Sequence, residues 1–409
     1  MNTLRAIAIL SGLLSGSGGV LRAADVKAVS PPDAKIVGPY TPGLLAGKFL
    51  YISGQGALNS KGEIPPATAA QVRQTLDNVK TILAAAGLTT EHLVYSQMYL
   101  TSASAYEEAF AAWGEYFKDG GPARAALGVA RMPVDTPVEI SAVAVTDLAM
   151  KRVIRLPGTP PGGAPPDAVI AGDRLYISSC PGLDAQGKAP AGSAAQTQLA
   201  LDRMGAVLKA AGAGFDHVVF VNPYLTGGVE TEAMNRVYAG HFKFGDTPAR
   251  ATISVSHLPH GAGIVFTGVA TTNLASRRSV RPKNMPPSPT ASPCVFAGDT
   301  LYCSAKSAFI PGPNQGIYAA GVENQVRQTM RNLLDGLEEA GMDLSHLVAT
   351  NVYLDDIREF AAMNRVYAGY LKTPFPTRTT VQPRPPVERK QNDREQWPMI
   401  EQISLVAVK

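Results

Sequence analysis

The amino-acid sequence predicts three tandem α+β domains, each with the element order β-β-α-β-α-β-β. The first observation is a phrase of small residues around an arginine, which recurs three times roughly 125 residues apart. It reads PARAALGV at 122–129, PARATISV at 248–255 and PTRTTVQP at 376–383. The second observation is that the same strand and helix patterns recur in the same order around each copy. A repeat of this length is the size of a domain, whereas solenoid repeats are far shorter.

Each unit begins with a predicted hairpin and a first helix. The second strands of the hairpins read FLYISGQ, LYISSCP and LYCSAKS, and each follows a glycine-containing turn. The helices start near Gln71, Gln196 and Gln325, and their apolar residues recur at the three- and four-residue spacing of one helix face. A glycine follows each helix, as is typical of helix ends.

The second half of each unit holds three further predicted strands and a second helix. A buried strand with a shared Tyr-Leu pair comes first (VYSQMYLT, VFVNPYLT and VATNVYLD), followed by the second helix and the arginine phrase. The last strand alternates between its two faces: VEISAVAV at 138–145, IVFTGVAT at 264–271 and IEQISLVAV at 400–408.

Two stretches predict the linkers: residues 155–166, rich in proline and glycine, and residues 281–293, rich in proline. They divide the chain into domains at 25–150, 151–277 and 278–409. Three similar domains in one chain favour a closed ring that buries the same kind of interface three times. Independent domains on linkers are the alternative.

Residues 1–24 have the pattern of a secretory signal peptide: Arg5, an apolar stretch, and Ala23-Ala24 before Asp25. We expect cleavage and export to the periplasm or the exterior; an uncleaved anchor is the alternative. The formal net charge of the chain is only +4, and 17% of its residues are charged. This charge predicts neither a nucleic-acid partner nor, after cleavage, a membrane partner.

The three cysteines lack the spacing of a metal site. A two-residue turn at Gly298-Asp299 would place Cys294 opposite Cys303 in a non-hydrogen-bonded pair, where side chains lie close together. We expect a disulfide there in an exported protein, with two buried thiols as the alternative.

The repeated phrases resemble the Rid family of reactive intermediate deaminases, also called YjgF-type or endoribonuclease L-PSP proteins. The resemblance rests on GPYTPG…GKFLYISGQ, QVRQTLDNVKTILAAAG, AMNRVYAGYL and PAR…VEISAVAV, and its three copies cover almost all of residues 30–409. It implies Rid/chorismate-mutase-like domains arranged as a trimer, with sheets inward, helices outward and ligand clefts between subunits. This chain would supply all three subunits as a monomeric intramolecular pseudo-trimer with non-identical clefts.

The resemblance also implies ligand-binding residues. In the deaminase branch, the arginine of the repeated phrase binds the carboxylate of an imine or enamine made from an amino acid, because its planar donor fork matches a carboxylate. A serine and backbone N–H groups near the SGQ strand orient the ligand, and no metal or cofactor is needed. The candidates are Arg124, Arg250, Arg378, Ser53, Ser178, Ser304, Tyr40, Gly54, Asn235 and Asn364. An interface salt bridge for each arginine and a turn cap for each serine are the ordinary alternatives.

Several of these positions differ between the units. The counterparts of Gly54, Tyr40 and the two asparagines are replaced in one or two units, by Ser179, Ala305, Pro165, Ala291 and Phe110.

The glutamate that handles water in the family is expected at Ser141, Thr267 and Ser404. A hydroxyl can position a water molecule but is a poor proton acceptor. Glu139 matches the other acid of the family pattern and is expected on the opposite face of its strand, and Glu401 would need a register shift. The sequence therefore predicts an anion-binding half-site that is retained and a proton-handling half that is altered in all three units.

Two functions follow from these observations. The first is a hydrolase similar to 2-iminobutanoate/2-iminopropanoate deaminases, acting on imines or enamines of small amino acids to give a keto acid and ammonia. The alternative is a catalytically silent protein that binds a small carboxylate between its domains. A ribonuclease is disfavoured because the charge is near neutral and no pair of histidines or metal site is evident.

Overall fold

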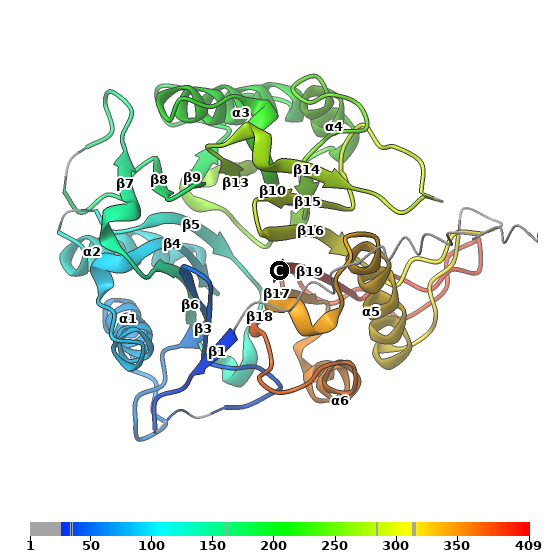
Figure 1. The fold of residues 1–409 in the computed structure, drawn as a ribbon, viewed down its shortest axis with the longest axis horizontal. Helices are drawn as coiled ribbons and strands as arrows, with labels where there is room; N and C mark the ends of the chain where they lie inside the picture. The colour runs from blue at the N-terminus through cyan, green and yellow to red at the C-terminus, as the bar shows by residue number, and fades with distance from the viewer. Residues whose placement is uncertain are drawn as a thin grey trace, which may run out of the picture.

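The computed structural model describes residues 26–32, 34, 36–118, 120–160, 162–283, 285–312 and 316–409. Within them the chain forms three mixed β-sheets, each backed by two α-helices, and the predicted α+β class is confirmed (Figure 1). The expected signal peptide lies outside the described residues. None of the helices in the described ranges is long and apolar enough to cross a membrane.

The first sheet has the strand order β1-β2-β3-β6-β4-β5. Only β4 and β5 run parallel; the other neighbouring strands are antiparallel. Its elements are β1 (Val26–Val29), β2 (Gly43–Ala46), β3 (Phe49–Gly56), α1 (Thr68–Ala85), β4 (Leu93–Leu100), α2 (Tyr106–Tyr116), β5 (Ala123–Gly128) and β6 (Val138–Val145).

The other two sheets repeat this topology. In the second, the strand of the arginine phrase is divided into two short pieces, β11 and β12, which both pair with β10. Its elements are β7 (Lys151–Ile154), β8 (Ala168–Ala171), β9 (Arg174–Pro181), α3 (Ser193–Ala210), β10 (Val218–Leu225), α4 (Thr231–Ala239), β11 (Ala249–Arg250), β12 (Ile253–Ser254) and β13 (Ile264–Thr271). The third contains β14 (Arg277–Val280), β15 (Cys294–Ala297), β16 (Thr300–Lys306), α5 (Val322–Glu339), β17 (Leu347–Leu354), α6 (Phe360–Tyr370), β18 (Thr377–Val381) and β19 (Glu401–Val408).

Each sheet begins with one strand more than the sequence predicts. These extra strands, β1, β7 and β14, pair with the first strand of each predicted hairpin. They are only four residues long, and in each of them only the last residue is buried. Such a short, half-exposed edge strand lacks the apolar alternation from which strands are predicted.

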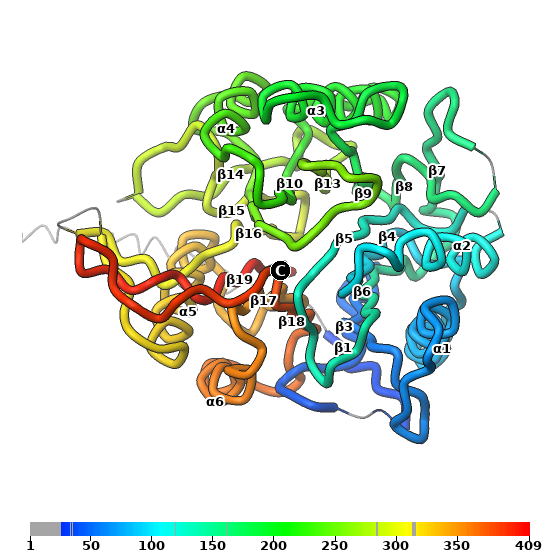
Figure 2. Tube along the Cα trace, turned by 180° about the vertical axis from the view of Figure 1, so that it is seen from behind, coloured from blue at the N-terminus to red at the C-terminus, as the bar shows by residue number. Residues whose placement is uncertain are grey.

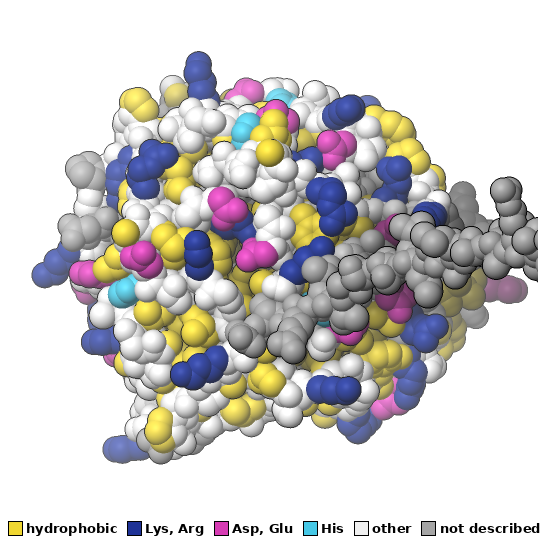
Figure 3. All heavy atoms as spheres, viewed as in Figure 1, with side chains coloured by type: hydrophobic (Ala, Val, Ile, Leu, Met, Phe, Trp, Pro, Cys, Tyr) yellow, Lys and Arg dark blue, Asp and Glu magenta, His cyan; other side chains and the backbone are white. Residues whose placement is uncertain are grey.

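The helices lie on the outer rim and the sheets face the centre (Figures 1 and 2). Both faces of each sheet are therefore covered, which explains the apolar residues on both faces of the strands. One face packs on the helices of its own domain, and the other contributes to central clusters that combine residues of all three domains. Acidic and basic side chains are interspersed over the surface seen in Figure 3.

The same kind of hydrogen bond occurs at all three interfaces, and its third copy closes the ring. The backbone N–H of the arginine in each repeated phrase donates to a serine hydroxyl of another domain. The pairs are Arg124 with Ser178 at 2.9 Å, Arg250 with Ser304 at 2.8 Å, and Arg378 with Ser53 at 2.9 Å. The third pair joins the last domain to the first, so the chain forms the pseudo-trimer that the sequence predicts.

Candidate functional site

Each interface holds one of the candidate arginines, and we name the three clefts after them. The Arg124 cleft lies between the first and second domains, and the Arg250 cleft between the second and third. The Arg378 cleft lies between the third domain and the first. Only the Arg378 cleft brings together most of the residues that the sequence singles out.

The Arg378 cleft contains a cavity of about 530 Å³. The first domain lines it with Tyr40, Gly54 and Glu139, and the third domain with Arg378 and Phe360. Residues from opposite ends of the chain therefore form one site.

Asn364 also belongs to this cleft. A Cβ atom built on Gly38 would lie 2.6 Å from Arg378 Nη2 and 3.1 Å from Asn364 Nδ2. The backbone at Gly38 therefore lies directly against both side chains, and only glycine leaves room for them. The Oδ1 atom of Asn364 is buried and has no hydrogen-bond partner among the described residues.

Arg378 is held by aromatic rings. Its guanidinium carbon lies 5.7 Å from the ring centre of Tyr40 and 5.2 Å from those of Phe360 and Tyr367. The side chain is buried, which lowers its pKa, and its Nη1 atom has no hydrogen-bond partner within the described chain. A buried cation with a free donor is suited to binding an anion.

Glu139 is the buried acid of this cleft, which the exposed Asp77 also lines. The expectation that Glu139 lies on the opposite face of its strand from residue 141 is wrong. Residues 139 and 141 are two apart on β6, so they lie on the same face of the sheet. The two positions differ along the strand: Glu139 lies in the cleft, whereas Ser141 lies nearer the centre of the ring. The first unit therefore retains an acid beside the arginine.

Burial raises the pKa of Glu139 to about 8, and the positive charge of Arg378 opposes part of this rise. A carboxyl group with a pKa near neutrality can exchange protons with a substrate at physiological pH. Strong perturbation of a titratable group in a cleft is typical of active sites.

The other two units lack an acid at this position. In the cross-strand register, Glu139 is opposite Tyr99, while Val265 is opposite Tyr224 and Gln402 is opposite Tyr353. Valine cannot exchange a proton, and the amide of glutamine is not a base. The Arg124 and Arg250 clefts therefore lack the acid–base group of the Arg378 cleft.

In the Arg124 cleft, aromatic side chains lie against the arginine. The guanidinium carbon of Arg124 lies 4.1 Å from the ring centre of Phe110 and 4.9 Å from that of Trp113. Phe110 occupies the position of the asparagine in the other units. Burial lowers the pKa of Arg124 to about 9.

The Arg250 cleft keeps the arginine and the asparagine. Arg250 Nη1 donates to Asn235 Oδ1 at 2.7 Å, and its guanidinium carbon lies 5.0 Å from the ring centre of Tyr238. Burial also lowers the pKa of Arg250. This arrangement could bind an anion, but the residue at the register position of Glu139 is Gln402, which is not an acid.

The candidate serines have a structural role at the interfaces. Besides accepting the arginine N–H, each hydroxyl donates to a backbone carbonyl of its own domain at 2.6 Å. The acceptors for Ser53, Ser178 and Ser304 are Thr41, Pro166 and Ser292. The hydroxyl hydrogen is therefore already used in a hydrogen bond. A ligand could only donate a hydrogen bond to the remaining lone pair of the serine oxygen.

The hydroxyl residues expected to position water lie near the centre of the ring. Ser141 and Ser404 line a central cavity, and the Thr267 hydroxyl donates to the backbone carbonyl of Ile177. Glu401 is on the opposite face of its strand, where it accepts from Thr329, and burial raises its pKa to about 8. These positions do not supply the missing acid in the second and third units.

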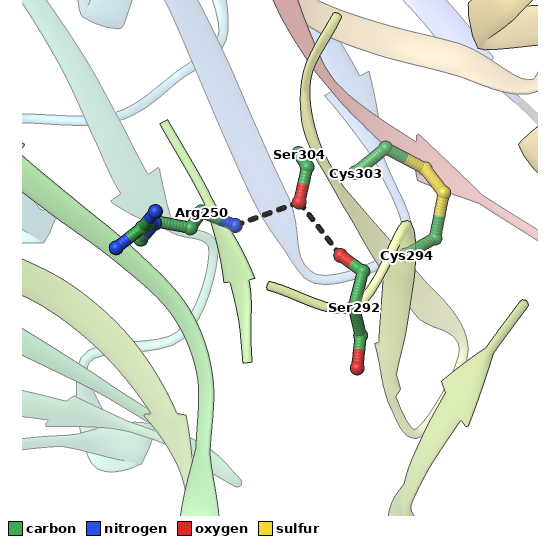
Figure 4. The surroundings of a disulfide bond; sticks show 5 residues. All are labelled: Arg250, Ser292, Cys294, Cys303 and Ser304. Carbon is green, nitrogen blue, oxygen red and sulfur yellow. Dashed lines mark hydrogen bonds between the residues drawn. A yellow bond between two sulfur atoms is a disulfide. The ribbon is translucent and has the colours of Figure 1, made fainter. Parts of the chain in front are cut away.

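Cys294 and Cys303 are register partners in the hairpin of β15 and β16, and they form a disulfide (Figure 4). This bridge lies next to Ser304, whose hydroxyl bonds the backbone of Arg250 (Figure 4). Cys180 is a buried free cysteine. Within the described ranges, no group of three or more His, Cys, Asp or Glu side chains could hold a metal ion.

Comparisons with known proteins point to one family. The model described as Endoribonuclease L-PSP matches residues 32–146, 164–271 and 284–385. The 2-iminobutanoate/2-iminopropanoate deaminase of Escherichia coli K12 is 39% identical over 113 residues, covering 27% of this chain and 88% of that protein. A RutC family protein of Pyrococcus horikoshii is 38% identical over 112 residues, covering 27% and 89%.

Two solved structures are also similar to single parts of the chain. The structure of the E. coli YjgF gene product is 36% identical and covers 30% of this chain and 99% of its own, with a TM-score of 0.29. That of E. coli TdcF with bound serine is 31% identical and covers 30% and 99%, with a TM-score of 0.28.

Proposed function

This chain belongs to the endoribonuclease L-PSP family, and we propose that it is a Rid-type deaminase whose active site is the Arg378 cleft. The substrate is an imine or enamine derived from a small amino acid, and the products are a 2-keto acid and ammonia. The observation that carries this proposal is the pairing of Glu139 from the first domain with Arg378 from the third around one cavity. The deaminase among the relatives gives the reaction its class.

The substrate carboxylate binds to Arg378. Its guanidinium has a free Nη1 donor in a buried, ring-lined position, where a charge-assisted hydrogen bond is strong. Asn364 and Tyr40 flank this end of the cleft and restrict how the ligand lies. The imine carbon then faces Glu139.

Glu139 handles the protons of the hydrolysis. Its raised pKa keeps it protonated near neutral pH, so it can donate a proton to the imine nitrogen and become a carboxylate. The carboxylate then accepts a proton from the water molecule that attacks the imine carbon. That proton passes to the nitrogen, which leaves as ammonia when the C–N bond breaks. The remaining proton of the new hydroxyl group returns to Glu139 as the C=O bond forms, so the imine and one water give a keto acid and one ammonia, and the acid is restored.

The test is to generate 2-imino acids in place with an amino-acid oxidase and to measure their hydrolysis with and without this protein. We expect Arg378→Ala and Glu139→Gln each to reduce the acceleration by about 10²-fold or more, as for a lost anchor or acid–base group. Arg124→Ala and Arg250→Ala are the matched controls and should retain most of the activity.

A different result would identify the alternative function. If the wild-type protein binds small carboxylates at Arg378 but accelerates no imine hydrolysis, the chain is a silent binding protein. Equal losses in all three arginine variants would contradict the assignment of activity to a single cleft.

A further inference from the structure

A second cavity, of about 110 Å³, lies where the three sheets meet. All three domains line it, through β3, β9 and β16 and the strands β4, β10 and β17. Arg378 lines both this central cavity and its own cleft, so the two spaces are adjacent at this residue. The proposed deaminase reaction does not use the central cavity.

The wall of this cavity follows a repeated pattern of paired rings. The third residue of β4 is Tyr95, which stacks on Tyr176 of the second domain with ring centres 5.9 Å apart. The third residue of β10 is Phe220, and its ring centre lies 6.1 Å from that of Tyr302 in the third domain. Both pairs join one domain to the next.

The third pair is incomplete. The third residue of β17 is Ala349, and the tyrosine at the matching position of the first domain is Tyr51. Among the described residues, Tyr51 forms a ring pair only with Phe49 of its own strand, with ring centres 6.5 Å apart. The cavity therefore includes the space that a third aromatic side chain at position 349 would occupy.

The volume and the walls suit a single aromatic ring. An engineered cavity with apolar walls and a somewhat larger volume, about 150 Å³, binds benzene. A ring placed over Tyr51 would complete the set of three pairs, and stacking of aromatic rings is favourable beyond the burial of their area.

The polar groups of the cavity point to a ligand that forms hydrogen bonds. The hydroxyl of Ser404 is buried and has no hydrogen-bond partner within the described chain. The side chains of Ser141 and Asn351 also line the cavity. Leaving a buried hydroxyl unpaired is unfavourable, so a ligand with a hydroxyl group gains by meeting it.

The ligand should be uncharged. Arg378 is the only charged residue among the described residues that line the cavity, and its guanidinium lies among the rings of the Arg378 cleft. Neither an anion nor a cation would meet an opposite charge in the central cavity, and burying an unpaired charge is strongly unfavourable. We propose that this cavity binds one small, neutral aromatic alcohol of the phenol class, stacked on Tyr51 in the place of the missing third ring.

The test uses 4-fluorophenol as the probe and the full-length protein, with binding followed by ¹⁹F NMR and calorimetry. Ala349→Phe fills the cavity with the missing ring and should weaken binding by about tenfold or more, the effect of losing a ring-sized contact. Phe220→Ala truncates one of the two complete pairs and should add a second binding site to the first. The change from one to two equivalents is an effect that general destabilisation does not produce.

Glu139→Gln separates this proposal from the proposed function, because it should reduce deamination about 10²-fold or more but leave the binding of 4-fluorophenol intact. Glu139 lines the Arg378 cleft and is not among the residues that line the central cavity. If Ala349→Phe does not fold, Ala349→Leu provides the same test with a smaller side chain. The proposal is overturned if millimolar 4-fluorophenol does not bind the wild-type protein. It is also overturned if the filled variants bind the probe as well as the wild type does, or if Phe220→Ala adds no site.

Discussion

At the scale of single residues, Gly54 and Glu139 depend on each other. A Cβ atom at Gly54 would overlap the carboxylate of Glu139, so the acid can lie where it does only because this position is glycine. The other two units have Ser179 and Ala305 here, opposite residues that carry no carboxylate. The one unit with glycine at this position is therefore also the unit that has the acid.

Replacing Gly54 with alanine should displace the Glu139 carboxylate. A shift of about 1 Å in a reacting group can reduce a rate about 10²-fold, and we expect a loss of that order in imine hydrolysis. Ala305→Gly, at the matching position of the third domain, is the control and should leave the rate unchanged. A Gly54→Ala variant with full activity would show that the position of Glu139 is not critical.

The titration of Glu139 predicts how pH affects the protein. The carboxylic acid with a pKa of about 8 is neutral below that pH and becomes charged above it. A negative charge would repel the carboxylate of a ligand held by Arg378. We therefore expect ligand affinity and kcat/KM to fall as pH rises through about 8, and Glu139→Gln to remove this dependence of affinity. Titrations with a small carboxylate at pH 6.5 and 9 would measure it.

Stability should depend on the same group. Between the ordinary pKa of a glutamate and about 8, the folded state keeps the proton of Glu139 while the unfolded state loses it. The unfolded state then binds fewer protons, so the free energy of unfolding decreases as pH rises through this range, by at most about 1.4 kcal/mol per pH unit. In urea unfolding from pH 5 to 8, the free energy of unfolding should decrease less steeply with pH for Glu139→Gln than for the wild type. Glu401 lowers the free energy of unfolding with rising pH in both proteins.

At the scale of elements, the strand that carries each arginine is attached to the neighbouring domain by a serine. The hydroxyl of Ser53 joins Arg378 on β18 to the backbone of Thr41 in the first domain. From the sequence, this serine is a candidate for binding the ligand. A polar residue next to a candidate site is compatible with binding the ligand and with supporting the interface. The partner that uses it lies more than 300 positions away in the chain, so local sequence does not reveal it.

Removing one of these serines should weaken one interface. Ser53→Ala leaves the Arg378 N–H and the Thr41 carbonyl unpaired, and we expect a loss of about 1–3 kcal/mol in the free energy of unfolding. Ser178→Ala, the matched control at the Arg124 cleft, should destabilise the protein similarly. Only Ser53→Ala should also reduce imine hydrolysis; equal activity in the two variants would contradict a link between this bond and the site.

At the scale of the whole molecule, fusion allows the three clefts to differ. A trimer of identical chains must place the same residues at every interface, whereas here each cleft combines a different pair of domains. The Arg378 cleft combines Tyr40, Gly54 and Glu139 with Asn364 and Arg378. In the Arg124 cleft rings lie against the arginine. The Arg250 cleft has an arginine bonded to an asparagine, and Gln402 at the register position of Glu139.

We expect the protein to be monomeric in solution, because the chain already closes its own ring. Small-angle scattering should give a compact particle with the mass of one chain. Calorimetric titration with a small carboxylate should show unequal sites, with the binding at Arg378 lost in Arg378→Ala. An obligatory trimer of this chain, or three equal and independent sites, would contradict this expectation.

The sequence by itself determined the three α+β units, their helices and hairpins, and the positions of the three arginines. These features follow from local patterns of apolar residues, glycines and turns, which repeat along the chain. Only the tertiary structure decided which arginine has an acid beside it, because Glu139 and Arg378 belong to different domains and meet only when the ring closes. The same closure aligned the three inner strands and revealed that Ala349 leaves one place without a ring.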